Sequence, residues 1–472
     1  YTVENRKLIG KMIDEEWMVP NEYFEQYYPD VCVEQEIPEF SDTLRIGCFL
    51  VVQKMFRDLQ IEDVLSSIFG DLGPFIEDIV SYMIANESCT FQYYSNFMRS
   101  HPVMDKNIRD DMQISRLLKY NIKEEDINLF LRAWNQMNNT KECIYVGYDS
   151  TNFNTNAYGI ELADYGHPKV DEGLPQYNLA YAVNQKDSTP LFYELYDGSV
   201  IDNTELEIML EEAKEFGHER LGVLMDRGYI SEKNIKALRS KGYEYILMMK
   251  QNQKICQEII EEYGAAVQSL EGYYIGEHGV YGTTVKKQLY GQETNIHVYY
   301  DDIRASEEKV ALMSRYETWE KEIEKKVAKK LATEGEMKKY RKVFKLKYDQ
   351  NGYLVAYQRN SRYIKEEIRN LGFFFIITSE DMSASKALDI YRGRDNIEKM
   401  FRSLKSGIDF NKARVHTTES LKSKVFVTFI AMIIRNELFQ KAEVLRKKNR
   451  KAYTVPGMIS ELENIECTRN SV

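Results

Sequence analysis

CIYVGYDST, residues Cys143–Thr151, is the stretch that decides the fold, because an apolar run of strand-forming residues there leads into an acid, Asp149. A second run, LGVLMDRGY at Leu221–Tyr229, leads in the same way into Asp226. Aspartate is unfavourable inside strands. Taken singly, each Asp is explained as a turn or capping residue. Taken together, two strands of one α/β sheet that both finish on Asp predict two carboxylates side by side at one edge.

Strand patterns and helix patterns alternate around these two runs. YNLAYAV (177–183) and LFYELY (191–196) are predicted to form a hairpin, and YEYILMMK (243–250) is predicted to be a further strand. Helical periodicity fills 203–217, and a serine followed by charged residues and a closing glycine predicts a capped helix at 231–242. Strands that alternate with helices in this way predict a mixed α/β sheet.

The chain of 472 residues is too long for one hydrophobic core, and its patterns predict five segments. Within the first segment, two helices meet at a short polar turn, which is typical of a helix bundle and only loosely resembles a helix-turn-helix. The segments are a helical N-terminal domain that is a candidate for DNA binding (1–138), the first part of the α/β core (139–255), an inserted β-rich domain with a charged helix (256–365), the second part of the core (366–440) and a C-terminal basic tail with a short helix (441–472).

Composition excludes several classes of protein. The six cysteines are scattered without a Cys-x-x-Cys pair, which favours a reducing compartment over a zinc finger or a disulfide framework. No run of about 18 apolar residues predicts a membrane span. The net charge of −11 does not exclude DNA, because residues 391–451 hold 16 Lys and Arg against 6 Asp and Glu, a local charge of +10. A basic segment on an acidic body can still hold a polyanion, since salt screens charges beyond roughly 10 Å.

One predicted helical segment, YRGRDNIEKMFRSLK at 391–405, combines a charged stripe with an apolar side. At about 100° per residue, Tyr391, Arg394, Glu398 and Lys405 fall within an arc of about 60°. One interpretation of this spacing is a solvent-exposed stripe of ion pairs, each of which would stabilise the helix by a few tenths of a kcal/mol. The alternative is that the helix packs its apolar side on the sheet and aims the stripe at a shared site.

Glu398 would then be a third carboxylate beside Asp149 and Asp226. Three converging carboxylates repel one another unless a cation lies among them. Oxygen ligands with an open coordination shell suit Mg²⁺ or Mn²⁺. Two such ions about 3.5–4 Å apart would activate a water or a 3′-hydroxyl and stabilise the leaving oxygen of a phosphodiester.

These residues resemble the DDE transposases of bacterial insertion sequences, in the subgroup related to insertion sequence 4. The hallmark of that subgroup is Tyr, two residues, Arg, three residues, Glu, six residues and Lys, which Tyr391, Arg394, Glu398 and Lys405 match without a gap. The acids occur in the expected order, 77 residues apart and then 172 residues apart. The longer gap fits a β-rich domain inserted before the glutamate. The resemblance spans about residues 140–440.

The resemblance implies an RNase H-like catalytic core, with Asp149 and Asp226 on strands and Glu398 on a helix, together binding two Mg²⁺ or Mn²⁺ ions. It implies cutting and joining of double-stranded DNA, with terminal inverted repeats and target DNA as partners. It further implies a homodimer in the synaptic complex, in the bacterial cytoplasm and associated with the nucleoid when bound to DNA. Two alternatives remain open: an RNase H-like nuclease without strand transfer, and a catalytically idle DNA-binding descendant.

DNA contacts are predicted for the stripe and its neighbour. Arg394 and Lys405 are expected to grip phosphates near the cleaved bond, and Tyr391 to hydrogen-bond or stack beside it. Arg402, one turn from Glu398, is expected to join them. Trp319 lies in the predicted insert, where related enzymes place an aromatic residue that handles a flipped base, but a packing role is the favoured interpretation of this tryptophan.

Overall fold

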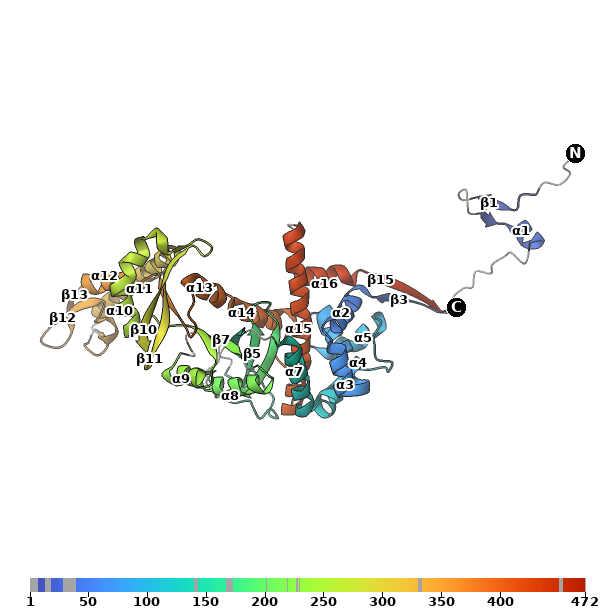
Figure 1. Cartoon of the computed structure of the whole chain (residues 1–472), viewed down its shortest axis with the longest axis horizontal. Helices are drawn as coiled ribbons and strands as arrows, with labels where there is room; N and C mark the ends of the chain where they lie inside the picture. The colour runs from blue at the N-terminus through green and yellow to red at the C-terminus, as the bar shows by residue number, and fades with distance from the viewer. Residues whose placement is uncertain are drawn as a thin grey trace.

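The computed structural model describes residues 7–12, 18–28, 40–139, 143–166, 173–200, 202–218, 220–225, 228, 230–329, 333–449 and 453–471. The body is elongated, with a large sheet near its middle, the N-terminal helices at one end and a projecting α/β unit at the other (Figure 1). Within these described ranges, no helix is long and apolar enough to cross a membrane.

Nine strands form the central sheet, in the order β6-β5-β4-β7-β8-β14-β11-β10-β9. The first three strands are antiparallel to one another, whereas β7 runs parallel to β4, and β8 runs parallel to β7. The remaining strands are added antiparallel. Their bounds, in sheet order, are β6 (Pro190–Asp197), β5 (Gln176–Asn184), β4 (Ile144–Asn154), β7 (Leu221–Met225), β8 (Glu244–Met248), β14 (Phe373–Thr378), β11 (Gln292–Tyr300), β10 (Val280–Leu289) and β9 (Tyr274–Ile275).

Helices cover both faces of this sheet, and several of its central strands are accordingly buried along their whole length. Every residue of β7 and β14 is buried. Along β14 the side chains alternate between the faces: Phe373 packs towards Gly264 of α10, and Phe374 belongs to the core that includes Leu388 of α13. The helices around the sheet are α8 (Asp202–Glu215), α9 (Glu232–Ser240), α10 (Lys254–Ser269), α13 (Ala384–Arg392) and α14 (Asp395–Arg402), with the short η6 (Glu271–Tyr273).

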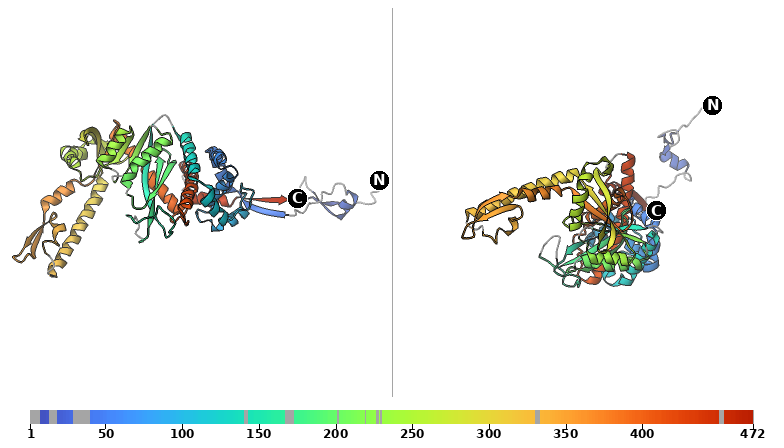
Figure 2. Two further views of the ribbon diagram at one scale, coloured as in Figure 1. Left: turned by 90° about the horizontal axis from the view of Figure 1, so that it is seen from below. Right: turned by 60° about the vertical axis from the view of Figure 1, so that its left-hand side comes forward.

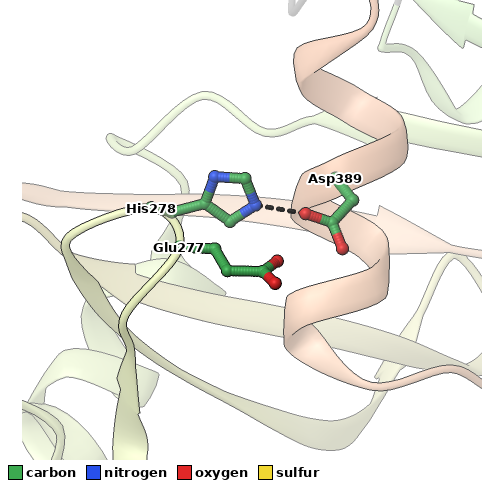
Figure 3. Close-up of side chains that lie close together, drawn as sticks. All are labelled: Glu277, His278 and Asp389. Carbon is green, nitrogen blue, oxygen red and sulfur yellow. Dashed lines mark hydrogen bonds and ion pairs between the residues drawn. The ribbon is translucent and has the colours of Figure 1, made fainter.

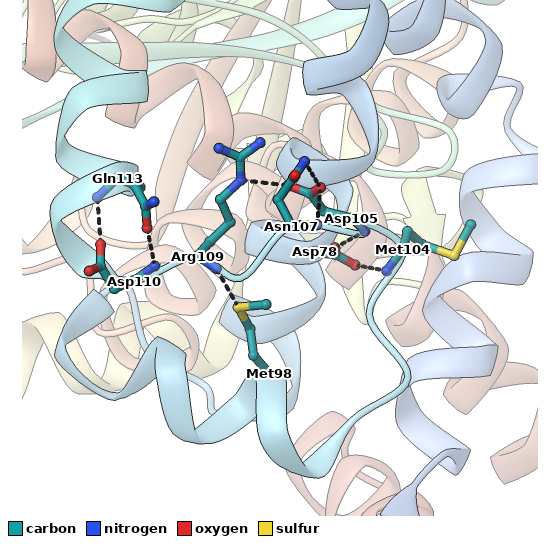
Figure 4. Close-up of polar contacts among 8 residues, drawn as sticks. All are labelled: Asp78, Met98, Met104, Asp105, Asn107, Arg109, Asp110 and Gln113. Atoms are coloured by element: carbon teal, nitrogen blue, oxygen red, sulfur yellow. Dashed lines mark hydrogen bonds and ion pairs between the residues drawn. The ribbon is translucent and has the colours of Figure 1, made fainter. Parts of the chain in front are cut away.

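The N-terminal part is a helical bundle, and its two predicted helices around a polar turn are confirmed as α6 and α7. Asp78, fully buried, accepts hydrogen bonds from the backbone N–H groups of Met104 (2.8 Å) and Asp105 (2.7 Å), which fixes the connection before α6 (Figure 4). The elements are α2 (Gly47–Asp58), α3 (Ile61–Phe69), η2 (Gly70–Leu72), α4 (Gly73–Ala85), η3 (Phe91–Tyr93), α5 (Tyr94–Ser100), α6 (Asp111–Arg116), the π-helical η4 (Leu117–Asn121) and α7 (Glu124–Asn138).

The long helix α15 (Thr418–Asn449) stands between the sheet and this bundle, in contact with β6 on one side and α4 on the other (Figure 1). Its apolar run from Val425 is buried on all sides, as predicted for a core helix. Beyond it lie α16 (Val455–Glu463) and β15 (Glu466–Ser471), which pairs with β3 (Phe40–Arg45). Before β3, the chain forms the hairpin of β1 (Gly10–Met12) with β2 (Met18–Pro20), and α1 (Glu22–Tyr27).

The elements of the predicted insert, 256–365, divide into two groups. β9, β10 and β11 extend the central sheet, whereas α11 (Asp302–Ala328), η7 (Lys338–Tyr340), β12 (Phe344–Tyr348), β13 (Leu354–Arg359) and α12 (Ser361–Arg369) form a unit with its own core that projects from the body (Figure 2). The predicted charged helix and hairpin are present, with Gly352 at φ +79° in the turn. Trp319 packs against Tyr316 and Tyr340 in this core.

The prediction of one continuous helix over 391–405 is wrong, because the regular α-helix is interrupted twice in this segment. α13 ends at Arg392 and α14 begins at Asp395, and the turn between them uses i→i−3 bonds: Gly393 donates to Ile390 (3.1 Å), and Arg394 donates to Tyr391 (3.0 Å). After Arg402 the chain widens into the π-helical η8 (Ser403–Gly407). A constant 100° step therefore does not describe the stripe.

Candidate active site

β4 brings the first predicted acid to the middle of the sheet, and the prediction that this strand finishes on Asp149 is wrong, because β4 continues to Asn154. Asp149 lies opposite Tyr181 of β5. Its side chain is 19% exposed, although its neighbours Tyr148 and Ser150 are buried. The strand therefore holds this carboxylate on the side that faces α14, since Ile397 of that helix packs over Gly147, two residues earlier on the same face.

Gly393, in the turn before α14, lies close against Gln185 in the loop after β5. A Cβ atom at this position would lie 2.3 Å from the side chain of Gln185, so only glycine fits this approach without movement. The amide of Asn396 donates to the backbone carbonyl of Gln185 (3.0 Å), which ties the first turn of α14 to the loop after β5. The break in the predicted helix is thus a fixed feature of the site.

Arg394, in the turn before α14, joins two of the predicted acids. Its Nη1 donates to Oε1 of Glu398 (3.1 Å), and its Nη2 lies 3.8 Å from Oδ2 of Asp149. The guanidinium is only 14% exposed, whereas the carboxylate of Glu398 is 54% exposed. Because one planar guanidinium reaches both groups, oxygens of Asp149 and Glu398 lie within about 10 Å of each other.

Lys405 reaches the same strand from η8. Its ammonium donates to the hydroxyl of Thr151 (2.7 Å) and lies 5.1 Å from the centre of the Phe153 ring. Thr151 is two residues beyond Asp149 on β4, so both side chains lie on one face of the strand. The structure thus brings two basic residues of the stripe, Arg394 and Lys405, to the strand that carries Asp149.

Asp226 lies outside the described residues, so its predicted place beside Asp149 stays a prediction. The strand that leads to it is described. β7 ends at Met225 and runs parallel to β4, with Leu224 opposite Gly147.

Tyr391 and Arg402, the other two residues predicted to contact DNA, are described in different surroundings. Tyr391 is buried in the core between α13 and the sheet. Arg402 is exposed and lines a cavity on the side of α14 that faces α15 and α16; that cavity has neither Asp149 nor Glu398 in its lining. DNA contacts by these two residues stay predictions.

The structure contains a second cluster of ionisable groups, which was not predicted from the sequence. Glu277, His278 and Asp389 place one ligand atom each within 4.8 Å of one another, the one such group among the described residues (Figure 3). Arg392 lies 2.7 Å from Nδ1 of His278, and Nε2 contacts Asp389. With Nδ1 accepting from the guanidinium, Nε2 holds the proton and donates to Asp389, which leaves no ring lone pair for a metal. Glu277 and His278 are adjacent in the sequence, but Asp389 lies 111 residues beyond His278, so no spacing signal marks this cluster.

Comparison with known proteins agrees with the resemblance. The model of the family described as "Transposase DDE domain" matches residues 146–434, more than half of the chain. Among solved structures, the piggyBac transposase in a synaptic complex with hairpin DNA is 8% identical, with a TM-score of 0.39 over 83% of this chain and 70% of that chain. That score is too low to support a conclusion. No curated protein matches the chain. The chain belongs to the family of transposases with a DDE domain, and is thereby a DNA transposase.

Proposed function

We propose that this transposase is of the insertion-sequence-4 type, cutting the ends of a mobile element and joining them to target DNA by two-metal phosphodiester chemistry. One observation carries the proposal: Arg394 joins Asp149 on β4 to Glu398 on α14, two acids 249 residues apart in the sequence. A solvated stripe of local ion pairs would account for the contact between Arg394 and Glu398. It would not account for the approach to Asp149.

The strand order supports an RNase H-like core. Three antiparallel strands, β6, β5 and β4, are followed by two parallel strands, β7 and β8, and a helix that carries an acid crosses β4. In this arrangement the first and fourth strands in chain order are neighbours. Asp149, in the middle of β4, and an acid directly after β7 would therefore lie side by side, opposite the acid of α14.

The donor set fits a hard divalent cation. Asp149 and Glu398 supply carboxylate oxygens, and we infer that Asp226, which follows Met225 directly, supplies a third group. Oxygen donors of this kind suit Mg²⁺ or Mn²⁺, and two ions would activate the attacking oxygen and stabilise the leaving oxygen of the phosphodiester.

The basic side chains have a role distinct from that of the acids. Arg394 and Lys405 lie beside the strand that carries Asp149, where their N–H groups are placed to bind phosphate oxygens on either side of the cleaved bond. The hydroxyl of Thr151 holds Lys405 in place at 2.7 Å. We infer that Tyr391 and Arg402 add DNA contacts, and that two copies of the chain hold two element ends in a synaptic complex.

Strand joining tests the proposal most sharply. Double-stranded oligonucleotides from the DNA that flanks the gene, pre-cut to expose a 3′-hydroxyl, are incubated with a plasmid and Mg²⁺. The chain is expected to join them to the plasmid. Asp149→Asn and Glu398→Gln are expected to lower the joining rate at least 10³-fold, because each removes a metal-binding charge. Glu215→Gln, which changes an exposed acid of α8 that pairs with Arg132, is the matched control and is expected to join normally.

The same assay separates the alternatives. Cleavage of uncut ends without joining would support a nuclease. DNA binding with neither reaction would support an idle descendant. Normal joining by Asp149→Asn or Glu398→Gln would overturn the assigned site.

A further inference from the structure

A cavity of about 320 Å³ lies against α14, and Asp149 is not among the residues that line it. It is bounded by α14, by η8, by the middle of α15 and by the start of α16. Neither Arg394 nor Glu398 lines it, so the cleavage chemistry leaves it without a role. The volume is at the lower end of the range of about 300–1,000 Å³ for small-molecule sites.

Arg435 of α15 is the buried cation of this cavity. Its side chain is only 6% exposed. Nε donates to the hydroxyl of Ser403 (2.9 Å), and Nη2 donates to Glu87 (2.7 Å). Nη1 is buried and has no partner within the described part of the chain. A buried charged donor without a partner is unfavourable, so an acceptor that reaches this guanidinium from the cavity would be well held.

Gly407 makes room for this guanidinium. A Cβ atom there would lie 2.5 Å from Nε of Arg435 and 2.6 Å from Nη2. The backbone of η8 therefore cradles the side chain, and any larger residue would displace it. This close approach of the backbone to a buried cation fixes the position of the guanidinium at the cavity.

The charge at the cavity wall favours an anion. Lys399, Arg402 and Arg446 line it together with Arg435, and the described lining contains no acid. Glu443 pairs with Arg446, and Glu87 with Arg435, which leaves Lys399 and Arg402 as excess positive charge. Arg side chains bind phosphate oxygens with two parallel donors.

Apolar side chains form another part of the lining, beside its serine, asparagine and threonine residues. Met400, Met432 and Phe439 meet Val455 and Pro456 across the cavity. A ring such as that of Phe439 is a stacking surface for a nucleic-acid base, and thioethers make favourable contacts with aromatic rings. Basic groups beside an apolar floor, in a space of this size, match one phosphate and one base.

We propose that this cavity binds a single nucleotide unit, with its phosphate on Arg435 and its base against Phe439 and the methionines. The nucleotide comes either from a DNA strand or from free solution, and the two sources share this chemistry. The site goes beyond the proposed cleavage function, because no acid of the catalytic centre contributes to it.

Calorimetric titration of the full chain tests the site with three probes: dAMP, deoxyadenosine and a 5′-phosphorylated hexamer of deoxyadenylate. dAMP, or the hexamer if a DNA strand is the source, is expected to bind at least tenfold more tightly than deoxyadenosine. Glu87→Gln/Arg435→Gln, which removes both charges of the buried pair, is expected to weaken binding at least tenfold. Glu87→Gln alone keeps the cation and is expected to bind at least as tightly as the unchanged chain.

Gly407→Ala is a second, independent variant, and it is expected to weaken the same binding by displacing the guanidinium. Asp149→Asn is expected to bind the probes normally even though it cannot cut, so failure of this proposal is distinct from failure of the proposed function. If dAMP binds and its binding depends on Arg435, the ligand of the cavity is a free nucleotide. If only the binding of the hexamer depends on Arg435, the ligand is a DNA strand. If neither probe binds in a way that depends on Arg435, the proposal is overturned.

Discussion

Arg394 holds the two described acids of the site together at the residue scale, because one planar guanidinium reaches both carboxylates. Arg394→Lys keeps the charge but loses the planar guanidinium with its several N–H donors. The single ammonium of the lysine cannot contact both Asp149 and Glu398 at the observed positions. We expect the cleavage rate to fall about 10–100-fold, at nearly unchanged stability. The measurement is a single-turnover rate beside a thermal melt, and a variant that cuts at the unchanged rate would refute the bridging role.

Lys424 of α15 is a buried cation, and it makes stability depend on pH. Burial lowers the pKa of its ammonium to about 8, from an ordinary value of 10.5, and the ammonium lies 4.8 Å from the centre of the Phe91 ring. At a pH between these two pKa values, Lys424 is protonated to a greater extent in the unfolded chain than in the folded chain. The burial penalty is therefore full below pH 8 and is relieved as the pH rises.

Lys424→Met should remove this dependence. We expect the variant to be more stable than the unchanged chain below pH 8, and its advantage to shrink by roughly 2–3 kcal/mol as the pH approaches 10.5. Urea unfolding at a series of pH values gives the difference between the two proteins. A constant difference would show that Lys424 does not titrate in this way.

The turn between α13 and α14 is decisive at the scale of elements, because it aims Glu398 at β4. Gly393→Ala would drive a methyl group into the side chain of Gln185. We expect a loss of about 1–3 kcal/mol in the free energy of unfolding. In a Gln185→Ala background the clash is absent, and the same change should be neutral or stabilising, since alanine favours helix by up to about 1 kcal/mol.

A double-mutant cycle of these two positions measures the coupling. A coupling free energy near zero would mean that Gly393 is not held by Gln185, and the account of the turn would be wrong.

At the scale of the whole molecule, local patterns predicted more than distant contacts. The strands before Asp149 and Asp226, the hairpin of β5 and β6, and the ion pair of Arg394 with Glu398 each follow from residues close in sequence. Periodicity does not give strand direction or sheet order, so the antiparallel addition of β14, β11 and β10 to the sheet came only from the structure.

Contacts between distant segments left no signal in the sequence. Arg435 and Glu87 are 348 residues apart, and His278 and Asp389 are 111 residues apart. The close approach of Gly393 to the side chain of Gln185 is likewise a contact that helical periodicity cannot report. These features depend on how the bundle, the sheet and α15 pack together.

Convergence of the three acids is the central claim, and Mn²⁺ binding tests it most directly because it needs neither cleavage nor a known target. Paramagnetic resonance counts bound Mn²⁺ on the unchanged chain, on Asp149→Asn, Asp226→Asn and Glu398→Gln, and on the control Glu215→Gln, each with an oligonucleotide from an element end. We predict two ions for the unchanged chain and the control, and fewer than two for each of the three acid variants. Two ions bound with undiminished affinity by Asp226→Asn would contradict the account.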